Sequence, residues 1–488
     1  MAVVLGLDIG TTSTIGILID TASRTTLATS SRPVRLYSEH PGWAEEDPAE
    51  WWANTAAICR ELTETTGRVP EAIGVTGMLP AVVLLDAEGR NLRRSIQQSD
   101  GRTGAEVAEL AAEIDEPAFL ARTGQGVSQQ LVAAKLRWLG KHEPETVAAT
   151  ATLFGSYDYI VWRLTGQRSL EQNWALESGF YDLATADLAD DLVALGGLRR
   201  DQLPPVRRSS EIVGCVTPEA AAATGLPAGT PVVAGCADHI ASAYVAGVTG
   251  PGDCLIKFGG AGDIMLATAE PKPDPRLFLD FHIMPGLFMP NGCMACSGAL
   301  LNWFVAELGG GRSHAELDRL AEKVPPGCDG LVCLPYFLGE KTPIQDPAAR
   351  GVFMGLTLAH GAGHLWRALL EAVVFGFRHH IEVARELGYP VTRVLASDGG
   401  TASAVWMQIA ADALGQPVQL LTGHPGSCLG AAWVAAMGTG LADDWAGVQD
   451  YVGQGRTVRP DPATAAAYGG AYRLYRDGYL ALKPLFRG

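Results

Sequence analysis

Apolar and polar residues follow one another in blocks along this chain, and the first block sets the pattern. Two strand-length apolar runs, Val3 to Ile9 and Ile15 to Ile19, are rich in β-branched residues, which favour strands. The turn between them, Gly10-Thr11-Thr12-Ser13, offers small residues and hydroxyl groups. Such a turn presents N–H donors to an anion, and Asp8 beside it then requires a cation between itself and a phosphate. The pattern is typical of a phosphate-and-magnesium hairpin, although an ordinary N-terminal hairpin would have it too.

The polar segment after this hairpin leads into a helix. Asp47 is expected to cap the helix and Pro48 to lie in its first turn, and the pattern continues to about Thr66. Apolar runs at 72–77 and 81–86 then predict two more strands.

Two loops next to these strands are candidates for holding a sugar. The first is Met78-Leu79-Pro80, and the second, Ile96 to Arg102, contains Gln98 and Asp100. Loops beside buried strands are common places for binding residues, but solvated connectors have the same composition.

Residues 104–164 have a helical pattern, and a short apolar strand at 231–235 follows later in the chain. This strand runs into Cys236-Ala237-Asp238-His239, and a helix is expected from Ile240. Asp238 therefore stands at a strand-to-helix junction, where a carboxylate either caps the helix or accepts a proton from a substrate hydroxyl.

The opening plan recurs about 250 residues further on. The segment 254–267 is again a strand, a small-residue turn containing Gly259 and Gly260, and a second strand. A repeated hairpin suggests a duplicated fold with one hairpin in each domain. We therefore expect a boundary near residues 245–250 and two domains, 1–247 and 248–488.

The second half also predicts a long core helix from about Gly363 to Leu387, followed by a strand at 391–396. Gly399-Gly400-Thr401 then separates this strand from a helix that ends near Leu414. A Gly-Gly turn allows a flat ligand to approach the backbone closely, and the helix N-terminus favours phosphate.

Composition narrows the classes of function. The 488-residue chain has a formal charge of −16 and no stripe of Lys and Arg, which argues against nucleic acid or an anionic membrane as partner. No signal peptide and no apolar run of membrane-spanning length are visible. The nine cysteines are odd in number and lie in apolar contexts, which predicts reduced thiols and a cytoplasmic protein. The Cys293–Cys296 pair is also expected to be buried thiols.

Several common motifs are missing. The chain contains no Gly-Lys-Ser/Thr loop, no Gly-x-Gly-x-x-Gly after a strand and no Gly-x-Ser-x-Gly, so any nucleotide must bind at the two hairpins. His360 and His364 have i, i+4 spacing, but the small residues between them make a helical metal site improbable.

The chain resembles the FGGY carbohydrate kinases of the actin/hexokinase/heat-shock ATPase superfamily over nearly its whole length. The C-terminal signature of that family is matched by Gly351-Val-Phe-Met-Gly-Leu and His364-Leu-Trp-Arg-Ala-Leu-Leu-Glu371, and the N-terminal one partly by the segment Lys135 to His142. The segments 41–52 and 334–343 look most like the xylulokinase branch.

The resemblance implies an α/β protein of two actin-like ATPase (ribonuclease H-like) domains with a deep cleft between them. It also implies ATP with Mg²⁺ and a small sugar as ligands, and a homodimer is common in the family. By position, Asp238 would be the general base and Asp8 would hold Mg²⁺ through water. The remaining residues that the resemblance places in the site are Gly10, Thr11, Thr12, Gly259 and Gly260 at the phosphates, Gly399, Gly400 and Thr401 at adenosine, and Met78, Leu79, Pro80, Gln98, Asp100 and His239 at the sugar.

Three positions depart from the family pattern. Ile15 stands where family members usually carry Lys or Arg, and Gly260-Ala261 stands where xylulokinases tend to have Thr-Ser. In the sugar loops, the segments 78–81 and 98–100 replace Gln-Met-His-Gly and Trp-Asn-Asp.

The leading hypothesis is an ATP-dependent kinase for a primary hydroxyl of a small ketose, with a pentulose such as xylulose preferred. Alternatives are a kinase for ribulose, a tetrulose, erythritol or glycerol, and a sugar- or nucleotide-binding protein with weakened catalysis. An actin-like chaperone is disfavoured, because no peptide-binding domain follows the second ATPase half.

Overall fold

The computed structural model describes residues 2–423 and 426–487. The chain forms two compact units, of which the first holds Met1–Val245, Leu279–Phe288 and Pro425–Tyr451. The second unit holds Ala246–Phe278, Met289–His424 and Val452–Gly488. The chain first passes from unit 1 to unit 2 after Val245, and two later segments return to unit 1. A single cut in the chain therefore does not describe the units.

Unit 1 is built on a mixed sheet in which β1 is central. The strand order is β13 (Ile212–Cys215), β14 (Pro231–Val233), β5 (Ala72–Gly77), β1 (Val3–Ile9), β2 (Ser13–Asp20) and β3 (Thr25–Pro33), with β15 (Cys236–Ala237) also paired to β5. Short pairs join β4 (Glu45–Glu46) to β7 (Ser95–Ile96), β6 (Val83–Leu85) to β8 (Thr152–Phe154), β9 (Leu170–Glu171) to β12 (Val206–Arg207), and β10 (Tyr181–Asp182) to β11 (Asp187–Leu188).

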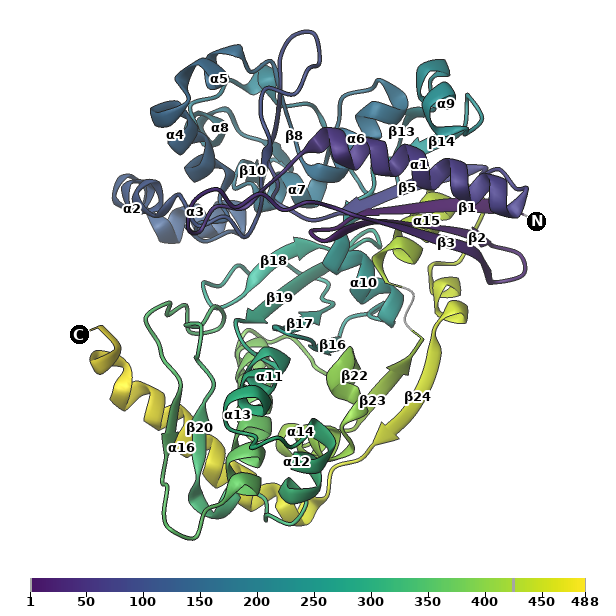
Figure 1. Cartoon of the computed structure of the whole chain (residues 1–488). Helices are drawn as coiled ribbons and strands as arrows, with labels where there is room; N and C mark the ends of the chain where they lie inside the picture. Colours follow the sequence, from purple (N-terminus) through teal and green to yellow (C-terminus); the bar gives the residue numbers. More distant parts are fainter. Residues whose placement is uncertain (1, 424–425, 488) are drawn as a thin grey trace. The chain divides into compact units, whose positions relative to one another are not determined.

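The helices of unit 1 come from distant parts of the chain. They are α1 (Pro48–Thr66), α2 (Gly104–Glu113), α3 (Glu116–Thr123), α4 (Val132–His142), α5 (Pro144–Ala149), α6 (Ser156–Thr165), α7 (Gln172–Glu177), α8 (Asp190–Ala194), α9 (Pro218–Thr224), α10 (Asp238–Ala246) and α15 (Ser427–Gly438). In Figure 1 the yellow-green α15 lies directly beside the purple β1, although more than 400 residues separate them in the sequence.

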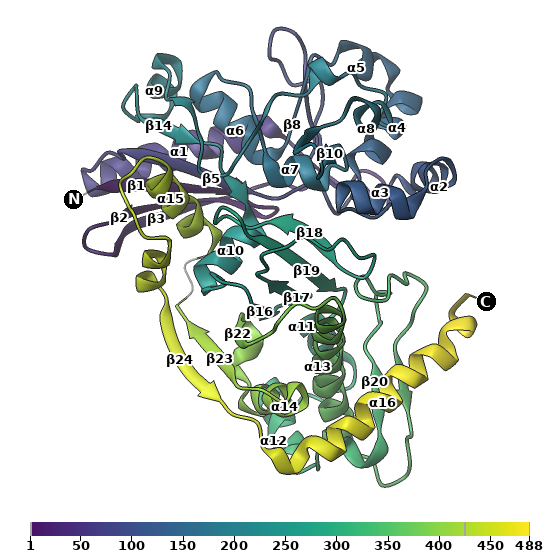
Figure 2. The same ribbon diagram turned by 180° about the vertical axis from the view of Figure 1, so that it is seen from behind.

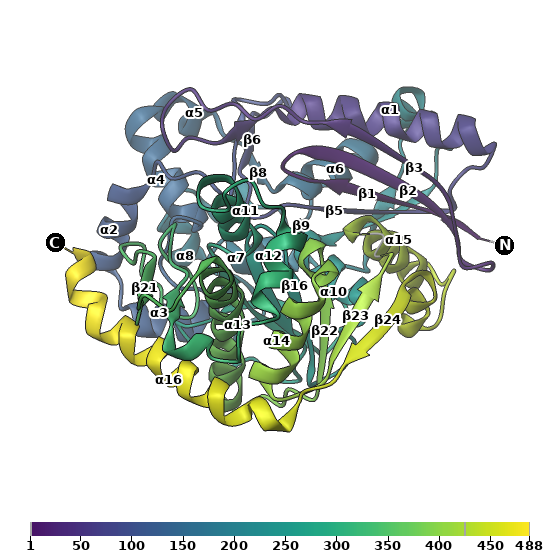
Figure 3. The same ribbon diagram turned by 60° about the horizontal axis from the view of Figure 1, so that its bottom comes forward.

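The helix α1 forms as local signals predict. Asp47 accepts a hydrogen bond from the backbone N–H of Ala49, Pro48 occupies the first turn, and Gly67 ends the helix with a left-handed φ of 63°. The helix runs along β2 and β3 (Figure 3). Gly16 of β2 makes this packing close, because a Cβ there would lie 2.4 Å from the side chain of Ile58.

Unit 2 is built on the sheet that contains the second hairpin. After the edge strand β18 (Phe278–Phe281), the strands of this sheet are β19 (Phe288–Met294), β17 (Gly262–Leu266), β16 (Asp253–Phe258), β22 (Arg393–Ser397), β23 (Val418–Thr422) and β24 (Gly453–Val458), in that order (Figure 2). β18 lies where the chain passes from unit 2 into unit 1. A separate pair joins β20 (Val332–Leu334) to β21 (Val352–Met354), and the helices are α11 (Gly298–Glu307), α12 (His314–Ala321), α13 (Ala362–Glu386), α14 (Ala404–Leu414) and α16 (Ala465–Leu482).

The core of unit 2 surrounds α13. Its apolar side chains at 366, 369, 373 and 377 are buried among residues from the sheet, α14 and α16. His360 precedes this helix and does not share it with His364, so the expectation that the two do not stand on one helix is confirmed. None of the helices in the described part of the chain combines the length and the apolar character that a membrane span requires.

Two sequence predictions were wrong in detail. The segment 104–164 is not helical throughout, because Thr152–Phe154 forms β8. The strand expected at 81–86 is shorter, Val83–Leu85, and pairs with β8 instead of joining the main sheet. A run as short as Thr152–Phe154 cannot be assigned to helix or strand by periodicity alone, which explains the first error. The ends and the pairing partner of a strand depend on tertiary contacts, which explains the second error.

Candidate active site

Three strand ends of unit 1 meet at one edge of the sheet. Ile9 at the end of β1 pairs in parallel with Gly77 at the end of β5, and Gly77 also pairs with Ala237 at the end of β15. The residues that follow are Gly10, Met78 and Asp238. The structure therefore brings the predicted phosphate turn, sugar loop and general base to one edge, where α/β proteins commonly bind ligands.

Asp8 lies just below this edge and is buried. Its Oδ2 accepts a hydrogen bond of 2.8 Å from Ser427 Oγ, at the first residue of α15. Its Oδ1 has no hydrogen-bond partner among the described residues. Burial, and then the charge of Asp238, raises the pKa of Asp8 to about 7. A buried carboxylate oxygen without a donor fits a cation, which would favour the ionised form.

Asp238 is the first residue of α10, and its carboxylate is part of a chain of polar groups. Asp238 Oδ1 accepts a hydrogen bond of 2.5 Å from the backbone N–H of His239 and lies 3.4 Å from His239 Nδ1. The other ring nitrogen, Nε2, lies 3.0 Å from Asp280 Oδ2 and 3.8 Å from Glu177 Oε1. The side chain of Asp238 is 35% exposed, so a substrate can reach it. Asp238 thus begins its helix and also offers its carboxylate to a ligand.

The neighbours of His239 decide its charge. Burial disfavours the imidazolium, but the hydrogen bonds with Asp238 and Asp280 outweigh burial and hold the pKa of His239 well above its usual range. Burial, together with the charge of Asp280, raises the pKa of Glu177 well above its usual range. In this cluster the charged form of the His239 imidazole and the protonated form of Glu177 are therefore favoured.

The side chains of the predicted sugar loop are apolar. Met78, Leu79 and Pro80 are all buried. Their carbonyl groups are held by buried donors: Ser156 Oγ donates to the Met78 carbonyl at 2.6 Å, and Lys135 Nζ donates to the Pro80 carbonyl at 2.8 Å. The loop is thus fixed in position, and shape is the main property that it can offer to a sugar.

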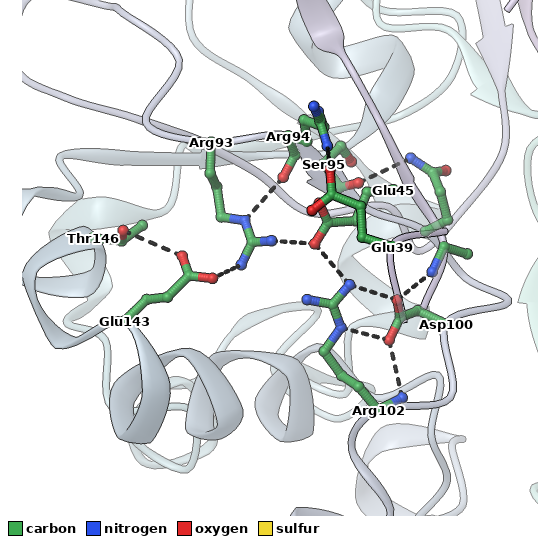
Figure 4. Close-up of polar contacts among 11 residues, drawn as sticks. Glu39, Glu45, Arg93, Arg94, Ser95, Asp100, Arg102, Glu143 and Thr146 are labelled. Atoms are coloured by element: carbon green, nitrogen blue, oxygen red, sulfur yellow. Dashed lines mark hydrogen bonds and ion pairs between the residues drawn. The ribbon is translucent and has the colours of Figure 1, made fainter. Parts of the chain in front are cut away.

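The second loop is fastened by an ionic network (Figure 4). Each carboxylate oxygen of Asp100 accepts two hydrogen bonds, from the side chain and backbone of Arg102 and from the Ala44 backbone N–H. Arg102 also pairs with Glu45 at 2.7 Å, and Glu45 contacts Arg93. Asp100 is therefore an anchor of its loop, while Gln98 is half-buried. Contact of either residue with a sugar stays a prediction.

The buried Lys135, which donates to the Pro80 carbonyl of the first loop, leads to a testable prediction. Burial lowers the pKa of this lysine to about 7, against the attraction of Asp100 and Glu177. Between pH 7 and 10 the unfolded chain, whose lysines titrate near 10.4, therefore binds more protons than the folded protein. The unfolding free energy should rise with pH in this window, by at most about 1.4 kcal/mol per pH unit from this group. Lys135→Met should lack that rise, and urea midpoints at pH 7 and 9 measure it. Parallel pH profiles of the two proteins would contradict the assignment.

In unit 2, the four predicted glycines line one cavity. Gly259 and Gly260 of the second hairpin and Gly399 and Gly400 of the turn after β22 all face a space of about 460 Å³. That volume is within the range of small-molecule sites. Thr401 is not among the lining residues, and its hydroxyl donates to the Asp398 carbonyl, which stabilises the turn.

The walls of this cavity are aromatic and close-packed. Phe258 and Trp406 meet edge to face with ring centroids 4.9 Å apart. A Cβ at Gly400 would lie 2.6 Å from both of these side chains, so only glycine fits there. At the rim, Asn302 Oδ1 lies 3.0 Å from His314 Nε2. The cavity thus combines apolar faces with a few polar groups, as a site for a flat heterocycle requires.

Several residues of the site carry no sequence signal. Ser427 is 419 positions from Asp8, and Asp280 is 41 positions from His239. Glu177 at the end of α7 belongs to no motif. All nine cysteines are free thiols, but of the pair Cys293 and Cys296, both expected to be buried, only Cys296 is. Seven are buried, among them Cys296, whereas Cys215 is exposed and Cys293 is half-buried.

Comparison with known proteins identifies the family. The N-terminal domain of the FGGY family of carbohydrate kinases matches residues 3–245, and the C-terminal domain of that family matches residues 255–439. The chain belongs to this family, has its two-domain actin-like ATPase fold and is an ATP-dependent carbohydrate kinase.

Similar proteins cover the whole chain. The crystal structure of xylulose kinase from Rhodospirillum rubrum is 57% identical, covers 100% of both chains and has a TM-score of 0.96. Xylulose kinase of Escherichia coli K12 is 31% identical, covering 99% of this chain and 99% of its own. The L-xylulose/3-keto-L-gulonate kinase of the same organism is 30% identical over 92% of this chain and 91% of its own.

Proposed function

We propose that this kinase phosphorylates a primary hydroxyl of a small neutral ketose, a pentulose such as xylulose, with magnesium-ATP as the donor. The observation that carries the proposal is the meeting of Asp8, the Met78–Pro80 loop and Asp238 at one sheet edge of unit 1. The names of the similar proteins favour a pentulose over other sugars.

Asp238 is the proposed general base. Phosphoryl transfer needs an acceptor for the hydroxyl proton within hydrogen-bond reach, and a carboxylate can be that acceptor. The hydrogen bond from its own helix and the nearby imidazolium hold this carboxylate in one orientation. His239 and Asp280 are positioning residues in this proposal, because they fix Asp238 and need not touch the reacting atoms.

Asp8 is the proposed anchor for Mg²⁺, through water. The hydrogen bond from Ser427 to Oδ2 holds the carboxylate in place, and Oδ1 has no partner among the described residues. Oδ1 is therefore available to a water ligand of Mg²⁺. Magnesium, when bound, offsets negative charge on the phosphates. Gly10, Thr11 and Thr12 are proposed to donate to the phosphates, and both threonines are exposed at the turn.

The cavity of unit 2 is the proposed adenosine site. Its aromatic wall and the glycines at 399 and 400 suit a purine ring, and Gly259 and Gly260 would face the phosphates. A homodimer and a cytoplasmic location are proposals that follow from the family resemblance and the free thiols.

The charges near Asp238 favour an uncharged sugar. Three carboxyl groups, those of Asp238, Asp280 and Glu177, surround the single imidazole of His239. A sugar acid such as 3-keto-L-gulonate, which one relative's name includes, would bring its carboxylate towards like charge. Neutral polyhydroxy substrates can form hydrogen bonds with these groups without electrostatic repulsion.

A substrate panel tests the proposal. With ATP and Mg²⁺, the pure protein should release ADP fastest with D-xylulose, L-xylulose, D-ribulose or L-ribulose. Erythrulose, erythritol and glycerol should be slower, and gluconate and 3-keto-L-gulonate should give at least a tenfold lower kcat/KM. Absence of sugar-dependent ADP release across the panel would refute the proposal. It would favour a binding protein with weakened catalysis, for which Ile15 beside Asp8 is the specific observation.

A further inference from the structure

The two Gly-rich hairpins have the same register. In unit 1, Asp8 of β1 pairs with Ile15 of antiparallel β2 and also with parallel β5. In unit 2, Lys257 of β16 pairs with Asp263 of antiparallel β17 and also with parallel β22. Asp8 and Lys257 each stand two positions before the first glycine of the turn that follows. Lys257 is therefore the structural counterpart of Asp8.

The charges at these equivalent positions are reversed. The first hairpin has a carboxylate at position 8 and an apolar residue opposite it at position 15. The second hairpin has an ammonium group at position 257 and a carboxylate opposite it at position 263. The positive charge next to a phosphate turn thus lies on the second hairpin, because Ile15 provides none on the first.

The side chain of Lys257 lies on the face of β16 opposite to that of Phe258. Alternation along β16 places Lys257 on one face and Phe258 on the other, where the Phe258 ring packs against Phe377 and Trp406. Asp398 Oδ2 would lie 3.0 Å from a Cβ at Gly259. The absence of a side chain at Gly259 leaves the space in which this carboxylate stands.

The partner of Lys257 is distant. Lys257 Nζ lies 4.0 Å from Asp398 Oδ2, which is the limit of an ion pair, and the side chain of Lys257 is partly exposed. A partly exposed pair at this separation is weak, so the ammonium group can turn to a stronger anion at little cost. Asp398 itself comes directly before the Gly399-Gly400 turn that lines the cavity.

We propose that Lys257 binds the phosphate chain of the nucleotide at the second hairpin and supplies the positive charge that Ile15 does not. The inference deepens the proposed function and rests on its placement of the phosphates at Gly259 and Gly260. A lysine binds phosphate as a compact point charge, and donors aimed at the transferred group also stabilise the charge that spreads over it during transfer.

Nucleotide binding to the full-length protein tests the role of Lys257. Calorimetry should show that Lys257→Met weakens binding of ADP and ATP about tenfold and leaves the affinity for adenosine unchanged. Lys257→Arg keeps the charge and should bind ADP within about threefold of the unmodified protein. Lys323, which is exposed in the same unit, gives the matched control Lys323→Met, expected to bind all three ligands normally.

A second variant separates phosphate binding from a purely structural ion pair. Asp398→Asn breaks the pair with Lys257 but keeps the ammonium group, so ADP affinity should stay equal or increase. Equal weakening of adenosine and ADP by Lys257→Met, or the same loss in Asp398→Asn, would overturn the inference. These measurements need no sugar, so a protein inactive on the whole substrate panel that still shows the Lys257 dependence would refute the proposed substrate and support the phosphate contact.

Discussion

Asp238→Asn should lower kcat about a thousandfold, the middle of the range for loss of a general base. Asparagine has nearly the same shape as aspartate and keeps an oxygen that can accept the hydrogen bond from the His239 backbone N–H. It cannot accept the proton of the sugar hydroxyl. The expected defect is therefore in the chemical step and not in the geometry of the site.

Separate measurements of binding and turnover check this expectation. Sugar and ADP affinities measured by calorimetry should stay within about threefold of the unmodified protein, while kcat falls. Asp443 is exposed in unit 1, and Asp443→Asn is the matched control, expected to have normal turnover. If Asp238→Asn keeps more than about a tenth of the turnover, another group accepts the proton. If it loses sugar binding instead, Asp238 is mainly a binding residue.

Local sequence signals predict those elements of the fold that are stabilised by contacts between residues close together in the sequence. The helix α1 begins at Pro48 and ends at Thr66 as its cap residues indicate, and both hairpins lie where small residues interrupt apolar runs. In contrast, β8 was missed because a run of three residues between helices, Thr152-Leu153-Phe154, is too short to show a period. Its partner β6 lies about 70 positions earlier, so only the tertiary structure decides its state.

The residues of the candidate site also fall into two groups, those that local sequence signals reveal and those that they do not. Asp8, Asp238 and the glycines of the turns can be found from the sequence, because strand ends and Gly-rich turns are visible in it. The groups that set their charge and orientation cannot. Ser427 reaches Asp8 only because α15 returns to unit 1, and Asp280 reaches His239 only because the segment Leu279–Phe288 does the same. Chain crossings of this kind leave no mark in local sequence patterns.

The return of α15 to unit 1 depends on two glycines. Gly6 of β1 and Gly74 of β5 are directly paired, so their missing side chains leave one flat area on the sheet. A Cβ at Gly6 would lie 2.0 Å from the carbonyl oxygen of Cys428, and a Cβ at Gly74 would lie 2.0 Å from that of Ala431. Both obstructions are helix backbone, which cannot move without moving the whole of α15.

Gly74→Ala should therefore lower the stability of unit 1 by about 3 kcal/mol, the upper part of the range for overpacking a core. Scanning calorimetry measures this as a lower temperature of the transition that includes unit 1. Gly140, in the exposed part of α4, has nothing within 4 Å of a Cβ, so Gly140→Ala is the control and should be stabilising by up to about 1 kcal/mol.

The same substitution should also affect catalysis at temperatures where the protein stays folded. A displaced α15 carries Ser427 away from Asp8, which breaks their 2.8 Å hydrogen bond and leaves the Asp8 carboxylate less well oriented. We expect kcat of Gly74→Ala to fall further than that of Gly140→Ala. Normal stability and normal turnover of Gly74→Ala would contradict the close contact between α15 and the sheet. Lower stability with normal turnover would show that the orientation of Asp8 does not depend on Ser427.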